Sequence, residues 1–514
     1  KIKPPVFYLE NEKIARRHLH SFVLASFLRH NRGYYGNGQV KDFFGMDGEG
    51  VGLDALRSYL EEKGGELEER LRLIFQGDLS AELGLEDGSW TECLAGEDGA
   101  LTTLALEIRR DIETLNRIYE ERAKKQGKVD RISMLMRTLR EEKLIDRLAK
   151  GGVIPKYGFP VDVVELRLLG ESDVAKHVEL QRDLRIAIAE YAPGSRIVAG
   201  GWEIGSYAIK RVPDKEWEAF HYAICDKCGM LHRRRKEESE KNPFEKCESC
   251  EKELHPGRGS RLKGIYLIPR FGFLSSVEEG FRRPGLKRPP RRHTTQVFFL
   301  PDNFHEESHF TLELEGGKAR LRATYVPRSR LAVLNNTAYK VCGVCGYAVP
   351  EGEKIKDKHT TAYGYECAGT LLKYKLGHEF LTDVAYIEVE TGPRPREVWL
   401  SFLYALLEGA SRGLGVERSD LDGCLYPRTS VRGRPAVILF DNVPGGAGHC
   451  RQLATKDKED LLLLSLREGK RMVEACGCSP ESSCYGCLRD YSNQLYHVHL
   501  SRRSALDIFA LLGL

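Results

Sequence analysis

The sequence predicts an α+β protein with three parts: a helical N-terminal region, a central β-rich part with a cysteine-rich insertion, and a C-terminal α/β domain. Three observations support this. Apolar residues recur at helical spacing up to about residue 150, strand-like segments separated by turns dominate residues 151–335, and strands alternate with helices from about residue 380. A chain of 514 residues exceeds one ordinary hydrophobic core, so we place domains at residues 1–150, 151–335 and 336–514.

The N-terminal region is predicted to contain three helices. They cover residues 12–29, 52–76 and, with an internal break, 101–148, because apolar side chains repeat there at intervals of three and four. Glycine and acidic residues crowd residues 82–99, which we expect to form a loop.

The central part is predicted to begin with a strand over residues 161–168 and a helix over residues 174–190. β-branched and aromatic residues bounded by turn residues then indicate short strands. These strands are expected over residues 196–199, 206–210, 295–300, 310–314, 319–326 and 331–334.

The C-terminal domain is predicted to alternate strands with amphipathic helices. Strands are expected over residues 384–390 and 435–440, and helices over residues 396–412, 457–474 and 502–512.

Composition narrows the protein class. Hydrophobic residues make up 41% and charged residues 30% of the chain, as in soluble globular proteins. No apolar run approaches the roughly 20 residues of a membrane span, and no secretory signal opens the chain, so we expect a cytoplasmic protein without a membrane partner. In a reducing compartment, grouped cysteines favour metal binding over disulfides.

The insertion at residues 222–254 contains two Cys-x-x-Cys pairs separated by eighteen residues. This spacing is typical of a zinc ribbon, in which two turns each supply two thiolates to one tetrahedral ion. The predicted ligands are Cys225, Cys228, Cys247 and Cys250.

A second group of four cysteines lies within twelve positions near the C-terminus. Gly477 and Gly486 lie inside its two pairs and allow the tight turns that bring thiolates together. The predicted zinc ligands are Cys476, Cys478, Cys484 and Cys487.

A third group is incomplete. Cys342 and Cys345 form a knuckle, and Cys367 is a candidate third ligand. Either His359 or His378 would supply a fourth, and the spacing does not choose between them. A small buried apolar role for Cys367 is the alternative. The sequence therefore predicts two zinc sites and leaves a third open.

Two clusters of basic residues suit a polyanion such as DNA, because cations on a protein displace the counterions of phosphates. Net charge is only +4, so the signal lies in the clustering, and a solvated loop without a ligand is the alternative. The candidate contacts are Arg233, Arg234, Arg235, Arg288, Arg291 and Arg292. Tyr485, Tyr491 and Tyr496 are candidates for stacking on bases or for packing on the zinc knuckle.

A glycine-rich turn follows the strand over residues 435–440. Its notable residues are Asp441, Gly445, Gly446, Gly448, His449 and Cys450. Three interpretations are open: a tight turn that packs the strand on the zinc subdomain, a contact to a phosphate or nucleic-acid backbone, or a nucleophilic set of cysteine, histidine and aspartate. The sequence contains no GxxxxGK[ST] loop, so it gives no sign of a P-loop ATPase in this chain.

Taken together, these motifs resemble a known family. The resemblance is carried by the run LFDNVPGGAGHC over residues 439–450, the four C-terminal cysteines, Tyr491, Asn493 and the run LSRR over residues 500–503. Residues 380–514 resemble the MrfA-type zinc-binding domain found at the C-terminus of a group of superfamily 2 DEAD/DEAH-box helicases. Residues 4–18, 154–160 and 189–194 show weaker similarity to the segments that precede this domain.

The resemblance implies a function. It implies the accessory half of a DNA helicase that acts in DNA repair or phage defence, with DNA and a motor domain or subunit as partners. The leading hypothesis is a zinc-stapled DNA-binding module that positions nucleic acid for an ATP-driven motor. The alternatives are a scaffold that binds the helicase without touching DNA, through the helix at 396–412 or the helix at 101–148, and a hydrolase built on the cysteine, histidine and aspartate of the glycine-rich turn.

Overall fold

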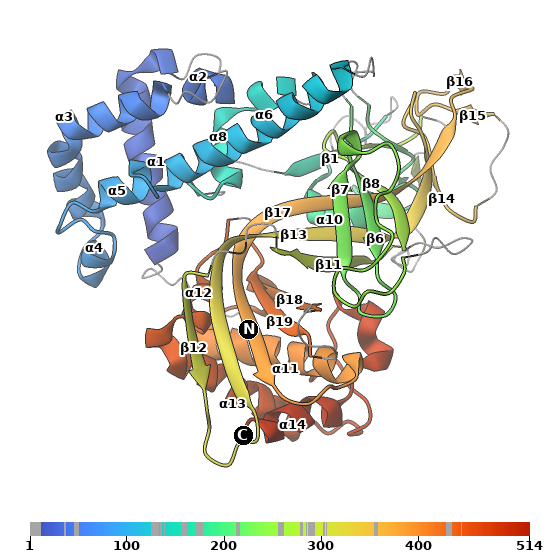
Figure 1. The fold of residues 1–514 in the computed structure, drawn as a ribbon. Helices are drawn as coiled ribbons and strands as arrows, with labels where there is room; N and C mark the ends of the chain where they lie inside the picture. The colour runs from blue at the N-terminus through green and yellow to red at the C-terminus, as the bar shows by residue number, and fades with distance from the viewer. Residues whose placement is uncertain are drawn as a thin grey trace.

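Two long antiparallel strands, β13 (Arg320–Cys342) and β17 (Leu371–Glu390), form the spine of the protein in this computed structural model (Figure 1). The structure describes residues 12–34, 38–45, 51–124, 133, 136–137, 139–155, 162–169, 178–211, 216–254, 262–277, 281–283, 285, 293–301, 304, 306–353, 358–427, 434–443 and 445–514. The mixed helix and sheet architecture confirms the predicted α+β class.

The spine belongs to a ten-stranded sheet in the order β11-β13-β17-β8-β6-β7, on which β12, β14, β18 and β19 also pair. The β17 strand pairs antiparallel with β13 and β19 but parallel with β8. The bounds are β6 (Glu218–Ile224), β7 (Leu231–Arg235), β8 (Lys263–Ile268), β11 (Thr295–Leu300), β12 (Ser308–Leu312), β14 (Ala348–Pro350), β18 (Leu421–Tyr426) and β19 (Ala436–Asp441). The hairpin β15 (His359–Thr360) and β16 (Glu366–Cys367) lies beyond the far end of the spine (Figure 1).

The two strands predicted over residues 319–326 and 331–334 are one strand, which corrects the sequence interpretation. Pro327 and the polar residues after it resemble a turn, and Arg328 does adopt a positive φ of 49°. Pairing with β17 resumes at Ser329 after a register shift, so the chain forms a bulge instead of reversing. The same strand crosses the boundary proposed between residues 335 and 336, and the domain division stays a prediction.

Four helices pack on the end of the spine that lies near the C-terminus (Figure 1). They are α11 (Arg396–Leu414), α12 (His449–Ala454), α13 (Glu459–Ala475) and α14 (Arg502–Leu511). Gly409 lets α11 and α13 approach closely, because a Cβ there would lie 2.0 Å from the carbonyl oxygen of Ser465. The α11 helix is buried on most of its surface, from Trp399 to Leu414. It therefore offers little surface for a partner, contrary to the scaffold alternative.

The N-terminal helices form a separate layer with its own apolar core. Their bounds are α1 (Glu12–His30), α2 (Val40–Phe44), α3 (Val51–Ile74), α4 (Asp78–Glu82), α5 (Trp90–Ala95), α6 (Ala100–Lys124) and α8 (Leu144–Lys150). The helices predicted at 12–29 and 52–76 are confirmed. The loop predicted over residues 82–99 contains α5, because Trp90 and Leu94 are buried in this core and fix a helical turn despite the polar composition around them.

Smaller sheets join the helical layer to the spine. Their strands are β1 (Val163–Arg167), β2 (Gln181–Asp183), β3 (Arg196–Ala199), β4 (Trp202–Gly205), β5 (Ala208–Ile209), β9 (Phe273–Leu274) and β10 (Phe281–Arg282). The helix predicted over residues 174–190 is shorter in the described part: it is α10 (Leu184–Glu190), which follows β2. Asp183 ends the strand and starts the helix, because its carboxylate accepts the backbone N–H of Arg185 at 3.0 Å.

Candidate metal centres and nucleic-acid interface

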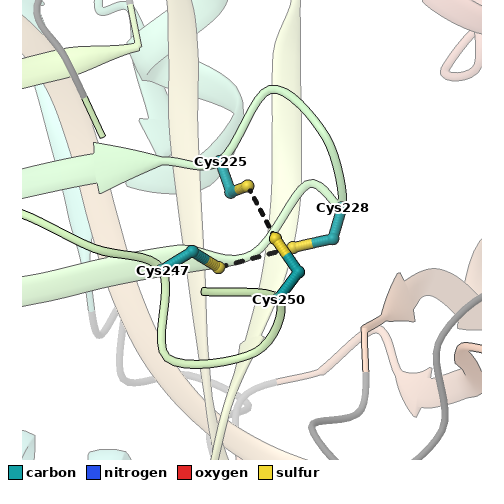
Figure 2. A group of neighbouring side chains, drawn as sticks. All are labelled: Cys225, Cys228, Cys247 and Cys250. Carbon is teal, nitrogen blue, oxygen red and sulfur yellow. Dashed lines mark hydrogen bonds between the residues drawn. The ribbon is translucent and has the colours of Figure 1, made fainter. Parts of the chain in front are cut away.

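The first cysteine group converges on one point between β6 and β7 (Figure 2). The sulfur atoms of Cys225 and Cys250 lie 3.5 Å apart and those of Cys228 and Cys247 lie 3.6 Å apart. Four thiolates bonded to zinc at about 2.3 Å lie about 3.8 Å from one another, so these residues fit the ion.

Local hydrogen bonds shape the first knuckle around Cys225. The N–H of Gly229 donates to the carbonyl of Cys225 at 2.8 Å, which closes the first knuckle. Burial would raise the pKa of the Cys225 thiol, but the N–H groups of Cys228 and Lys227 outweigh it and lower that pKa. A thiolate is the form that binds zinc.

The C-terminal group follows α13 directly. The sulfur of Cys476 lies 3.6 Å from that of Cys478 and 3.5 Å from that of Cys484, and the Cys478 and Cys487 sulfurs are 3.8 Å apart. A backbone N–H from Cys478 lowers the pKa of Cys476 to about 7.

Arg502 anchors this loop, a role that the sequence analysis missed. Its guanidinium donates to the carbonyl of Val473 at 2.7 Å, to that of Glu474 at 3.0 Å and to that of Cys478. It thereby satisfies the free carbonyls at the end of α13 and ties the metal loop to α14.

The third group is completed by a histidine. The Nε2 atom of His359 lies 3.3 Å from the sulfur of Cys345, and the sulfurs of Cys342 and Cys367 are 3.9 Å apart. All four ligand atoms lie within 4.8 Å of one another. His378, the other candidate, is buried in β17 and stacks on Phe380. The β15–β16 pairing places His359 opposite its partner cysteine, Cys367, which spacing alone does not reveal.

Each of the three groups supplies four protein ligands. A zinc ion held in this way has no coordination position left for a substrate, so these sites are structural. They fix turns that have few apolar residues of their own, in the manner of small zinc modules.

The glycine-rich turn is occupied by a carboxylate of the same chain. Asp441 is fully buried, and its Oδ2 atom accepts the N–H of Gly448 at 2.6 Å, together with those of Ala447 and His449, while Oδ1 accepts the N–H of Cys450 at 2.8 Å. These N–H groups at the start of α12 are the ones that a phosphate would need. The phosphate interpretation of this turn is therefore wrong.

The nucleophilic interpretation also fails. Cys450 is 0% exposed, and burial together with the charge of Asp441 raises the pKa of its thiol far above the ordinary value. The thiol thus stays protonated, whereas a nucleophilic cysteine needs a thiolate that a substrate can reach.

The turn instead packs against the N-terminal helical layer. Arg17 of α1 donates to the carbonyl of Gly152 at 3.1 Å and to that of Gly445. A Cβ at Gly445 would lie 2.9 Å from the Cα of Gly152, and Gly445 has φ of 76°. Arg451 adds an ion pair to Glu12 across the same boundary. The turn thus packs against the helical layer, whereas the packing interpretation placed it against the zinc subdomain.

The three arginines of β7 have different surroundings. Arg233 pairs with Glu379 at 2.9 Å, and Arg235 pairs with Glu218 at 3.3 Å. The side chain of Arg234, between them, is 51% exposed and lies 4.0 Å from Glu238. Alternation along the strand causes this difference, so Arg234 is the best placed of the three for a phosphate contact. Arg288, Arg291 and Arg292 lie outside the described residues.

The three candidate tyrosines differ in how exposed their side chains are. Tyr485 is 66% exposed and Tyr491 is 60% exposed, both next to the C-terminal cysteine group. Tyr496 instead packs against Tyr404, with ring centroids 6.1 Å apart. Tyr485 also meets His497 edge-on, with ring centroids 5.5 Å apart. Most of the surface of Tyr485 and of Tyr491 nevertheless faces solvent.

Comparison with known proteins connects this geometry to a family. Residues 402–488 match the family model of the MrfA Zn-binding domain, and all four C-terminal cysteines lie within this match. Residues 402–488 are therefore similar to the MrfA Zn-binding domain. The matched region carries the C-terminal zinc site and confirms the resemblance predicted from the sequence.

Relatives of the whole chain are more distant. It is 23% identical to the Druantia protein DruE of Escherichia coli (strain UMEA 4076-1), over 100% of this chain and 30% of DruE. The chain therefore spans less than a third of that relative. Two solved structures of the DUF1998 helicase MrfA are also similar, each at 11% identity. The one bound to DNA covers 68% of this chain and 34% of MrfA with a TM-score of 0.32, and the one bound to DNA and AMPPNP covers 74% and 45% with a TM-score of 0.20.

None of the described helices combines the length and the apolar character that crossing a bilayer requires.

Proposed function

We propose that this chain is a zinc-stapled accessory module of a DEAD/DEAH-type helicase, which binds DNA and positions it for an ATP-driven motor. The observation that carries the proposal is the MrfA-type zinc-binding domain with its complete cysteine group. The sequence has no P-loop, so the motor would be supplied by another domain or subunit. DNA repair or phage defence is the proposed setting.

The exposed side chains around the zinc sites suggest how the module would hold a strand. Tyr485 and Tyr491 project from a loop that zinc and Arg502 hold rigid. Bases of a single strand stack on such rings irrespective of sequence. Arg234 on the first ribbon would contact the phosphate backbone.

Fluorescence anisotropy with a labelled single-stranded oligonucleotide tests this proposal. Replacing both Tyr485 and Tyr491 with Ala should weaken binding by about 1–3 kcal/mol for each base that loses its ring. Tyr365 is equally exposed on the third zinc group, so Tyr365→Ala is the matched control and should bind normally. Arg234→Gln should weaken binding and lower the slope of log affinity against log salt by about one.

The same titration separates the proposal from its alternative. Absence of DNA affinity at low salt would refute a DNA-binding module. Co-purification with a motor protein, combined with that absence, would select the scaffold alternative.

A further inference from the structure

A pocket lies where the two cysteine-only zinc modules meet the main sheet. The first ribbon contributes Gly229, directly after a zinc ligand, and the loop that follows the C-terminal cysteines contributes Ser492 and Tyr496. The remaining wall comes from α10, α11, β11, β13 and β18. The pocket is therefore formed only when segments far apart in the sequence have assembled.

Two arginines face this pocket without a carboxylate partner. Arg185 of α10 donates to the side-chain oxygen of Asn442, and its guanidinium lies 5.8 Å from the ring centre of Phe380. Arg396 begins α11, whose N-cap residue, Pro395, gives the helix no side-chain cap. Neither arginine has an ion pair in the part of the chain that the structure describes. Both side chains are half-buried, which raises the cost of leaving their charges unmatched.

The first zinc knuckle holds Arg396 in place. A Cβ at Gly229 would lie 3.1 Å from Nη1 of Arg396, so the guanidinium rests against the knuckle backbone. Burial raises the pKa of the Tyr496 hydroxyl, and the charge of Arg396 beside it opposes that rise. The guanidinium of Arg396 thus lies between the two zinc modules, and a cation confined in this way loses less entropy on binding.

The other polar groups in the pocket are mostly hydrogen-bond donors. Thr295 and Tyr404 each offer a hydroxyl hydrogen and Gln296 offers amide hydrogens, whereas the hydroxyl of Ser492 already donates to Asp490 at 2.7 Å. The one carboxylate among the lining residues belongs to Asp422, and its Oδ1 already accepts the N–H of Gly423 at 2.8 Å. The balance of charge and donors favours an anion with several acceptor oxygens.

The size of the pocket narrows the choice of anion. Its volume of about 140 Å³ is far above the ~10–15 Å³ that one water needs, and below the ~300 Å³ at which sites for drug-sized ligands begin. A whole nucleotide would not be enclosed, whereas a tetrahedral headgroup with its ester oxygen would. We propose that this pocket binds a phosphate monoester, with Arg185 and Arg396 as its two cationic ligands. Guanidinium groups suit this ligand because each offers two parallel N–H bonds to phosphate oxygens.

The ligand chemistry has two sources, a free nucleoside monophosphate and the phosphorylated end of a nucleic-acid strand. Isothermal titration calorimetry with the full chain, kept reduced and loaded with zinc, separates them. The probes are thymidine 5′-monophosphate, thymidine, and one oligonucleotide with either a 5′-phosphate or a 5′-hydroxyl end. Thymidine 5′-monophosphate should bind and thymidine should not. A strand-end source predicts tighter binding of the phosphorylated oligonucleotide, and a free-nucleotide source predicts equal binding of the two.

Variants then assign the pocket. Arg396→Gln and Arg185→Gln should each weaken monophosphate binding about tenfold, because a charged hydrogen-bond pair is lost. Arg471→Gln removes an exposed arginine of α13 outside the pocket and should bind normally. Arg396→Lys keeps the charge but loses the two-pronged donor, so it should recover only part of the affinity.

The inference goes beyond the proposed function and can fail separately from it. If thymidine 5′-monophosphate does not bind the wild-type chain, or if Arg471→Gln weakens it as much as the pocket variants, the pocket assignment is wrong. DNA binding that persists in that case leaves the proposed function intact. If Arg396→Gln does not fold, as judged by circular dichroism, the Arg185→Gln result decides.

Discussion

Replacing Asp441 with Asn is the sharpest test of how the glycine-rich turn is built. The carboxylate accepts four backbone N–H groups, three of them at Oδ2 and one at Oδ1. An amide of the same shape has only one oxygen. We expect this oxygen to take the Oδ2 position, which leaves the NH₂ group facing the N–H of Cys450.

The magnitude follows from this count. A hydrogen bond to a charged group contributes about 1.5–3 kcal/mol, and Asn loses one such bond outright while the other three become neutral. Asp441→Asn should therefore lower the free energy of unfolding by about 2–4 kcal/mol. Asp441→Ala removes every acceptor and should cost more. These losses of stability apply to the C-terminal part of the chain, which contains the turn.

Thermal unfolding of the reduced, zinc-loaded chain and hydrogen exchange at residues 447–450 measure the effect. The amides of these residues should exchange faster in Asp441→Asn and fastest in Asp441→Ala. Asp457→Asn, an exposed aspartate beyond α12, is the control. Unchanged exchange in Asp441→Asn would refute the internal cap. A gain of phosphate affinity in the same variant would show that the turn can take an external anion once its own carboxylate is gone.

Three further predictions concern metal, packing and pH. Elemental analysis of reduced protein should find three zinc ions per chain, one for each ligand group. Cys478→Ser should remove one zinc ion, whereas Cys93→Ser, which lies outside the groups, should remove none. Fewer than two zinc ions in the wild-type protein would contradict the zinc assignment. Gly409→Ala should lower the free energy of unfolding by about 1–3 kcal/mol, because the new Cβ would meet the Ser465 carbonyl. The same change on an open helix raises that free energy by up to ~1 kcal/mol. A higher melting temperature for Gly409→Ala would therefore rule out the close helix crossing. Burial would raise the pKa of Glu218, but neighbouring arginines lower it to about 2 from 4.5. The ionised Glu218 therefore contributes up to about 3 kcal/mol to the free energy of unfolding above pH 4.5, and this contribution is lost as the pH falls toward 2. Urea titrations of Glu218→Gln should show a smaller loss of stability between these pH values.

Features whose chemistry is local could be predicted from the spacing of residues along the chain. Two cysteines separated by one or two residues place their thiols close together, and two such pairs at short spacing are typical of a zinc site, so both complete cysteine groups were predicted with their ligands. The helix α11 and the buried strand β19 were also predicted, because their apolar spacing depends only on neighbouring residues.

Features that depend on partners far away in the sequence became clear only from the folded protein. Pairing with β17 carried β13 through the turn-like residues at Pro327, since a long ladder of hydrogen bonds outweighs one local signal. Strand pairing also places His359, and not His378, beside the cysteines of the third group. It brings Arg233 and Arg235 next to glutamates that lie on other strands. The assembled chain also formed the phosphate-sized pocket between two zinc modules, because that site exists only where seven separate segments meet. Spacing along a chain encodes a local turn, whereas contact across a sheet depends on which strands pair.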